Sequence, residues 1–182
     1  MQGGLKTKAE QENLYLVGFM GAGKSTLGAA LAQLLFRRHV DTDVLVEQRA
    51  GRCVADIFAA QGEAAFRELE SQTLAEISQE KSLVVSLGGG TVLSPENWKF
   101  ICQTGKSVYL DWPTEVLLAR ILTDQARPLV TGSEASERSA ILSALLARRR
   151  PFYEKCDLTV QCGTEDSPSA VAVEIVNRLK EL

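Results

Sequence analysis

The sequence has little of what a metal cluster or a disulfide framework needs. It contains one histidine, His39, and four cysteines in 182 residues, with no CxxC pair. Zinc sites and disulfide scaffolds draw on clustered Cys and His residues, so both are disfavoured. Reduced thiols with a structural role are expected instead.

The sequence also lacks an apolar segment of the roughly 20 residues that a membrane span requires. Residues 1–13 are polar, without an apolar signal core, and are expected to form a flexible tail. These absences predict a cytoplasmic protein that does not enter a membrane. The net charge of −3 gives no reason to expect a nucleic-acid partner, because such proteins are more often basic.

What is present is an ordinary globular composition, with 45% hydrophobic and 24% charged residues. This length predicts a single domain over residues 14–182. Apolar runs alternate with helical patterns along the chain. The apolar runs lie at 14–18, 82–87, 107–112 and 157–162, with a short one ending near Val40, and the helical patterns lie at 24–36, 63–79, 114–122, 136–149 and 168–181. The alternation predicts a three-layer α/β/α fold around a parallel sheet of about five strands.

The first apolar run leads directly into "GFMGAGKST", residues 18–26, which matches the GxxxxGK[ST] phosphate-binding motif. Successive backbone N–H groups at the start of a helix form a nest for phosphate oxygens. Lys24 can reach the β- and γ-phosphates, and the Ser25 hydroxyl can ligate Mg²⁺. The residues expected at ATP here are Gly21, Ala22, Gly23, Lys24, Ser25 and Thr26.

No Asn-Lys-x-Asp motif for guanine is present, and the chain is shorter than most nucleotide-driven machines. The function indicated is therefore transfer of phosphate to a small acceptor. The polar segment 123–135 joins two predicted helices, and both a simple loop and a lid over a site are compatible with it.

Two aspartates follow the predicted second strand in "VDTDVL", residues 40–45. In an extended segment Asp41 and Asp43 share one face, where a divalent cation would relieve their repulsion. The alternative is an Asx turn that caps a helix, and this does not exclude a role at the site.

Arg67 lies at the margin of a helical apolar arc formed by Phe66, Leu69 and neighbouring residues, and Glu70 lies inside that arc. A surface ion pair with Glu63 or Glu70 is one interpretation. A charge within an apolar arc favours a site arginine that is oriented by glutamate.

The order of further motifs is more specific than the phosphate-binding loop. "GEAAFRELE" (62–70), the triplet Gly88–Gly90 after a buried run, "ARPLV" (126–130) and "RRRPFY" (148–153) follow the paired aspartates. Over about residues 14–157 this set resembles the shikimate kinase family. The resemblance implies a fold like that of nucleoside-monophosphate kinases, with a mobile lid at about 123–135 and a substrate-binding region at about 43–72.

The resemblance implies transfer of the γ-phosphate of ATP to the 3-hydroxyl of shikimate, a step of chorismate and aromatic amino-acid synthesis. Mg²⁺ would be the cofactor, ATP and shikimate the partners, and the chain a monomer. Asp43 would orient the attacking hydroxyl, and whether it also takes the proton stays open. Asp41 would act on the metal through a water, next to Ser25.

The remaining roles also follow from the resemblance. Arg67 and an arginine two residues before Pro151, which is Arg149, would hold the substrate carboxylate, although Arg148 and Arg150 adjoin it. Gly88, Gly89 and Gly90 would lie against the ring. Arg127 would clamp phosphate on lid closure, and Arg120 would stack on adenine. A gluconate-type kinase and a non-catalytic nucleotide-binding relative remain as alternatives.

Overall fold

The computed structural model describes residues 11–123 and 134–181. A five-stranded sheet lies at its centre, in the order β2-β3-β1-β4-β5, and every pairing is parallel. The prediction of a parallel sheet is thus confirmed. The strands are β1 (Asn13–Val17), β2 (Arg38–Asp41), β3 (Leu83–Ser86), β4 (Gly105–Asp111) and β5 (Leu158–Gln161).

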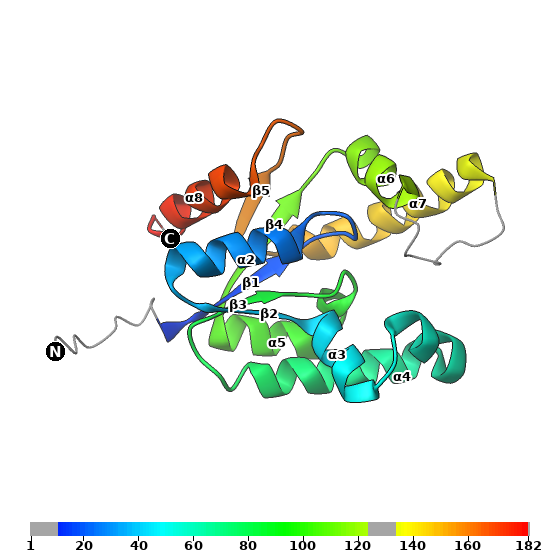
Figure 1. The fold of residues 1–182 in the computed structure, drawn as a ribbon, viewed down its shortest axis with the longest axis horizontal. Helices are drawn as coiled ribbons and strands as arrows, with labels where there is room; N and C mark the ends of the chain where they lie inside the picture. The colour runs from blue at the N-terminus through cyan, green and yellow to red at the C-terminus, as the bar shows by residue number, and fades with distance from the viewer. Residues whose placement is uncertain (1–10, 124–133, 182) are drawn as a thin grey trace, which may run out of the picture.

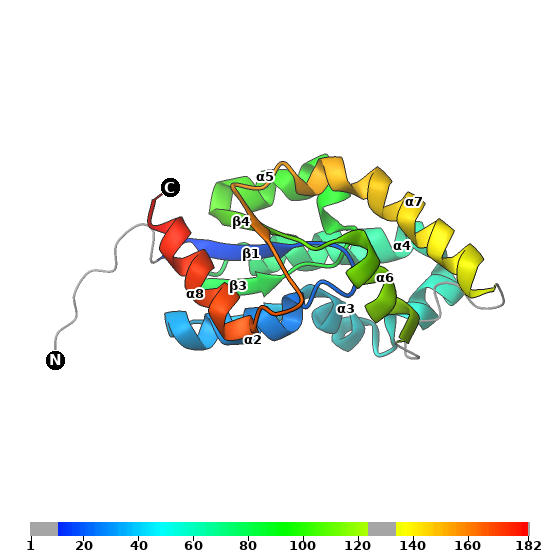
Figure 2. The same cartoon turned by 90° about the horizontal axis from the view of Figure 1, so that it is seen from above.

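Helices cover both faces of this sheet. Figure 2 shows α5 and α7 on one side and α2 and α8 on the other, which confirms the three-layer α/β/α prediction. The described helices are α2 (Lys24–Leu35), α3 (Thr42–Ala50), α4 (Val54–Ile77), the short 3-10 helix η1 (Thr91–Leu93), α5 (Pro95–Thr104), α6 (Thr114–Thr123), α7 (Ala135–Tyr153) and α8 (Pro168–Leu179). No helix among the described residues is long and apolar enough to cross a membrane.

The main core lies between the sheet and its helices. All residues of β1 and β3 are buried, because parallel strands covered on both faces have no side exposed to water. Leu14, Leu16, Val84, Val85 and Val108 are each at most 2% exposed. A second, smaller cluster joins α3 and α4 through Val46, Ile57 and Phe66.

The structure corrects several boundaries. Asn13, expected in the flexible tail, is the first residue of β1 and is buried. Its side-chain amide accepts from Leu83 N (2.9 Å) and donates to Glu80 O (2.9 Å), so its burial leaves no polar group unsatisfied. Helices α3 and α5 were not predicted, and α4 begins nine residues before the predicted helix at 63. Residues 1–10 of the expected tail lie outside the described residues.

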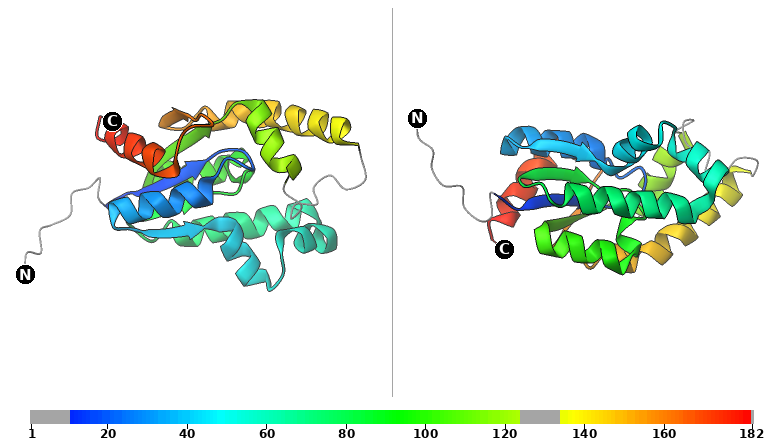
Figure 3. Two further views of the ribbon diagram at one scale, coloured as in Figure 1. Left: turned by 45° about the horizontal axis from the view of Figure 1, so that its top comes forward. Right: turned by 90° about the horizontal axis from the view of Figure 1, so that it is seen from below.

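The carboxyl ends of the parallel strands meet along one edge of the sheet, where open α/β sheets bind ligands. Figure 1 shows the loop between β1 and α2 at this edge, and Figure 3 shows α6 and α7 on one side of it and α3 and α4 on the other. The expected lid at 123–135 falls between α6 and α7, and residues 124–133 lie outside the described residues.

Candidate active site

The phosphate-binding motif forms the turn between β1 and α2, as the sequence predicted. Gly21 and Gly23 both have φ 77°, a left-handed conformation that side chains disfavour. Gly23 is the N-cap of α2, and Lys24 is its first residue. The N–H groups of the first helical turn have no partner within the helix, so this end of α2 can receive phosphate oxygens.

The Lys24 ammonium lies folded back over this loop. Its Nζ donates to the carbonyl oxygens of Gly18 (2.8 Å) and Phe19 (3.0 Å). The positive charge is therefore held beside the start of α2, within reach of an anion that binds there.

Asp41 and Asp43 are separated by the change from strand to helix. Asp41 ends β2 and caps α3, accepting on Oδ1 from the backbone N of Asp43 (3.0 Å) and Val44 (3.5 Å). The expectation of an extended segment with both carboxylates on one face is thus wrong, because Thr42 already starts the helix. The capping alternative is correct. The cap uses only Oδ1 of Asp41, so Oδ2 can contact other groups.

That second oxygen connects Asp41 to the phosphate loop. Ser25 Oγ donates to Asp41 Oδ2 at 2.5 Å. A hydroxyl and a carboxylate side by side at the start of α2 are oxygen ligands of the kind that Mg²⁺ prefers. No group of three or more His, Cys, Asp or Glu side chains that could hold a metal occurs among residues 11–123 and 134–181. Phosphate and water oxygens would have to complete the coordination.

The glycine triplet after β3 is held close to other side chains. Gly88 N donates to Thr42 Oγ1 at 2.9 Å. A Cβ at Gly88 would lie 2.6 Å from Asp43 Oδ1 and 2.5 Å from Glu70 Oε1, and one at Gly90 would overlap the Arg67 guanidinium. The triplet and the predicted residues Asp43 and Arg67 therefore meet in one place.

Arg67 is held by two glutamates of its own helix. Its Nη1 donates to Glu70 (2.7 Å), and its Nε and Nη2 lie 3.3 Å from Glu63. Glu70 is 1% exposed and also accepts from Thr91 Oγ1 at 2.5 Å. Burial works against the charge of Arg67, but Glu70 and Glu63 outweigh it and hold its pKa above the ordinary value. The simple surface ion pair is excluded, because one partner is buried.

The three consecutive arginines of α7 have different surroundings. Arg149 Nη1 approaches Gly89 O at 3.4 Å, and its buried Nε has no hydrogen-bond partner among the described residues. Arg150 pairs instead with Asp111 at 3.0 Å, and Arg148 is exposed. Of the three, Arg149 thus lies against the glycine triplet, in agreement with its selection from the Pro-x-Tyr spacing.

A cavity of about 240 Å³ lies on the other side of the phosphate loop. The Arg120 guanidinium stacks 3.8 Å above the Trp112 ring and donates to Gly21 O at 3.2 Å. Trp112 Nε1 donates to Ala22 O at 3.0 Å. The predicted stacking of Arg120 on adenine stays a prediction. The other lining residues include Gly23, Thr26, Leu27, Leu110, Cys162, Asp166, Pro168 and Val171.

Sequence reasoning missed most of this cavity. The sequence indicates an adenine-side loop at 161–169 but singles out no residue in it, and it indicates Trp112 only as the end of a β-like run. In this loop the Asp166 carboxylate accepts from Gly163 N at 2.6 Å, and Asp166 N donates to Gly163 O at 3.2 Å, so the two bonds close the turn. Predicted Arg127 lies outside the described residues.

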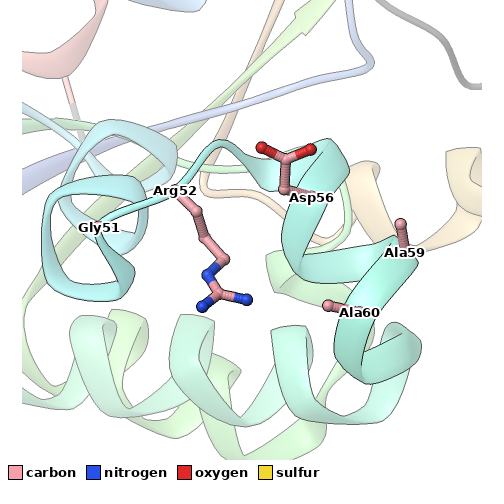
Figure 4. Close-up of a pocket in the computed structure, with 5 residues that line it drawn as sticks. All are labelled: Gly51, Arg52, Asp56, Ala59 and Ala60. Atoms are coloured by element: carbon pink, nitrogen blue, oxygen red, sulfur yellow. The ribbon is translucent and has the colours of Figure 1, made fainter.

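A further hollow of about 580 Å³ lies between the turn after α3 and the first part of α4. Figure 4 shows Arg52 and Asp56 at its rim, with Gly51, Ala59 and Ala60. All five residues are exposed, and none belongs to the phosphate loop or the glycine triplet. It is open surface beside the candidate site rather than part of it.

Comparison with known proteins decides the family. The family model for shikimate kinase matches residues 20–180. The chain belongs to the shikimate kinase family. The prediction made from the motifs is confirmed, and with it the enzyme class, an ATP-dependent kinase that phosphorylates a hydroxyl of shikimate.

Individual members of the family are similar over nearly the whole chain. A shikimate kinase of Synechococcus sp. strain JA-3-3Ab is 47% identical over 163 residues, 89% of this chain and 84% of the relative. One from Synechococcus sp. strain CC9605 is 44% identical over 179 residues, 98% and 87% of the two chains. The structure of shikimate kinase from Acinetobacter baumannii in complex with shikimate has a TM-score of 0.88 and 34% identity, covering 95% of each chain.

Proposed function

We propose that this chain binds shikimate between α4, the glycine triplet and α7, and phosphorylates its 3-hydroxyl with ATP held on the β1–α2 loop. The observation that carries this proposal is the pair of arginines at the triplet. Arg67 lies against Gly90 and Arg149 against Gly89, although they come from helices far apart in sequence. Two guanidinium groups facing one short loop suit a carboxylate, which arginine can bind in a bidentate manner.

ATP is assigned to the loop residues Gly21, Ala22, Gly23, Lys24, Ser25 and Thr26. The backbone N–H groups and Lys24 would hold the phosphates, and Arg127 would join them on the lid side. Arg120 would lie beside the adenine base of ATP, in the cavity that Trp112 and the 161–169 loop border. Phosphoryl transfer gains most from such positioning and charge stabilisation.

Mg²⁺ fits the oxygen pair of Ser25 and Asp41. Ser25 would ligate the ion directly and Asp41 through a water, consistent with the 2.5 Å contact of the two side chains. Bound there, Mg²⁺ would supply charge neutralisation for the phosphate groups. Capping of α3 through Oδ1 holds Asp41 in its orientation.

Asp43 is assigned to the acceptor hydroxyl. It belongs to the first turn of α3, next to Gly88 and across from the buried Glu70. From this position it would orient the 3-hydroxyl toward the γ-phosphate, and Gly88, Gly89 and Gly90 would lie along the ring. Whether Asp43 also accepts the hydroxyl proton stays open, and general-base assistance would contribute about 10²–10⁴ in rate.

The substrate is tested by ADP release in the presence of ATP and Mg²⁺. Shikimate should stimulate release strongly, whereas gluconate and nucleoside monophosphates should not exceed the rate without acceptor. Stimulation by gluconate but not by shikimate would overturn the proposal. Omission of Mg²⁺ with excess chelator should abolish the activity, and unchanged activity would remove the metal from the assignment.

Asp43 has its own test. Asp43→Asn keeps the size of the side chain but removes its charge, so kcat should fall about 10²-fold or more. The Kd for ATP, measured by titration calorimetry, should stay within about twofold, because the phosphate loop is unchanged. An Asn variant with the activity of the parent would remove Asp43 from the mechanism.

A cytosolic setting and a monomeric state are also proposed. The four cysteines are all free in the structure, as a reducing compartment favours. One chain by itself brings the phosphate loop, both arginines and Asp43 to the same edge, so a second subunit is not needed to complete the site.

A further inference from the structure

The carbonyl oxygen of Gly89 is met by two donors from the last turns of α7. Tyr153 Oη donates to it at 2.6 Å, and Arg149 Nη1 approaches it at 3.4 Å. The two residues are four positions apart, which places them on one face of the helix. The middle glycine of the triplet is thus fixed from the same helix that supplies one of the proposed carboxylate ligands.

Tyr153 is built into the core at this point. Its side chain is fully buried and packs against Tyr109, with ring centroids 5.3 Å apart. Burial raises the pKa of the phenol to about 12, and the nearby Arg149 and Arg67 only partly oppose this. The hydroxyl therefore stays protonated and can donate throughout the physiological pH range.

The two bonds to Gly89 O differ in strength. The tyrosine bond is short, whereas the arginine contact lies at the far end of hydrogen-bond range. The buried Nε of Arg149 has no partner at all among the described residues. The guanidinium is consequently held near the triplet by its contact with Gly89 O and by a hydrogen bond to the Tyr153 side chain, while its Nε stays without a partner in the described part of the chain.

Loss of the Tyr153 hydroxyl would leave Gly89 O without its short hydrogen bond. Gly89 is half-buried, and a carbonyl there that loses its short hydrogen bond will take another donor within reach. The nearest one on α7 is Arg149, so the guanidinium would be drawn onto the carbonyl. It would then be less available to an anion that enters the site.

We propose that Tyr153 is a positioning residue for the acceptor substrate: its hydroxyl satisfies the Gly89 carbonyl and so keeps the Arg149 guanidinium free for the substrate carboxylate. The inference rests on the proposed function, in which Arg149 receives that carboxylate. It assigns Tyr153 no contact with the reacting atoms.

The test compares Tyr153→Phe with Tyr109→Phe in steady-state kinetics. Each change removes one buried hydroxyl from the same pair of packed rings, but the Tyr109 hydroxyl donates to Asp111 (2.8 Å), away from the triplet. Tyr153→Phe should raise KM for shikimate about tenfold, the size expected when one charged hydrogen bond to the carboxylate is weakened. Its KM for ATP and its kcat should stay within about twofold. Tyr109→Phe should leave all three values within about twofold.

A second variant separates this mechanism from general loosening of the fold. In an Arg149→Ala background, Tyr153→Phe should add no more than about twofold to KM for shikimate, because there is no guanidinium left to divert. An equal penalty in both backgrounds, equal effects of the two tyrosine changes, or an unchanged KM in Tyr153→Phe would each overturn the inference. An unchanged KM for shikimate in Arg149→Ala alone would instead overturn the carboxylate assignment of the proposed function.

Discussion

At the scale of single residues, the three glycines of the triplet lack a side chain for different reasons. Gly88 and Gly90 leave room for side chains of the protein itself, namely Asp43, Glu70 and Arg67. Gly89 differs, because a Cβ there would meet nothing closer than 3.5 Å, with Arg149, Gly18 and Met20 as its nearest neighbours. A methyl group at Gly89 would therefore fit the free protein, at ordinary contact distance from the Arg149 guanidinium.

Gly89→Ala should therefore affect mainly substrate binding, and Gly90→Ala mainly the stability of the fold. Gly89→Ala should raise KM for shikimate at least tenfold while the free energy of unfolding changes by less than about 0.5 kcal/mol, since nothing in the free protein is displaced. Gly90→Ala should lower the free energy of unfolding by about 1–3 kcal/mol, because its methyl group overlaps a guanidinium that is held by two glutamates. Urea unfolding and shikimate kinetics on both variants give the comparison. Equal stability losses in the two variants would contradict this account.

At the scale of elements, α4 is two helical segments joined at Gly62. That glycine has φ 80° and ψ 174°, a conformation that is essentially restricted to glycine. The break turns the first segment back so that Phe58 packs on Phe66, with ring centroids 4.7 Å apart. Arg67 follows Phe66 directly, so this turn supports the segment that carries the proposed carboxylate ligand.

Gly62→Ala should lower the free energy of unfolding by about 1–3 kcal/mol. A Cβ at this position would meet no atom within 4 Å, so the loss would come from backbone conformation rather than from a clash. Urea unfolding measures it, with Gln61→Ala as a control at an exposed, regular helical position of the same helix. The control should stay within about 0.5 kcal/mol of the parent. A Gly62→Ala variant as stable as the control would show that the backbone conformation at residue 62 does not require glycine.

At the scale of the whole molecule, the only histidine links the sheet to the phosphate-loop helix. Ser86 Oγ donates to Lys24 O (2.9 Å), so His39 Nε2, also 2.9 Å from Ser86 Oγ, acts as the donor to that hydroxyl. Burial lowers the pKa of His39 below its ordinary value of 6.5, and the charge of Asp41 opposes this only in part. The folded protein therefore resists protonation of His39 more than the unfolded chain does.

This difference predicts a loss of stability in mild acid. As the pH falls from about 7.5 to 5.5, the unfolded chain takes up a proton near pH 6.5 while the folded state takes it up only at lower pH. The unfolded state then holds more protons, so the free energy of unfolding decreases as the pH falls. In His39→Gln the decrease over the same range should be smaller, as measured by urea unfolding at several pH values. Parallel pH profiles for parent and variant would exclude His39 as the source.

The sequence predicted the parts of the site that depend on local spacing. The phosphate loop needs its glycines and Lys24 in a fixed order between a strand and a helix, so nine consecutive residues are enough to recognise it. Helix α5 also carries a local start signal, because Ser94 precedes Pro95 and Ser94 Oγ accepts from Asn97 N.

Other features required the fold. The spacing of Asp41 and Asp43 suits both a strand and a capped helix start, and the hydrogen bonds of Asp41 decide for the cap. Trp112 and the loop at 161–169 border one cavity only because β4 and β5 are neighbours in the sheet. Nothing in the sequence near Trp112 specifies that contact.

By itself, then, the sequence determined the family, the parallel α/β architecture and the phosphate loop, since each rests on periodicity or on residues close together in the chain. Only the tertiary structure decided why Gly88 and Gly90 must lack side chains, that Arg149 lies against Gly89, and that the Tyr153 hydroxyl donates to the same carbonyl. Those answers depend on side chains from α3, α4 and α7 that meet across the ends of the strands. Packing in three dimensions creates these contacts, and a linear pattern carries no record of them.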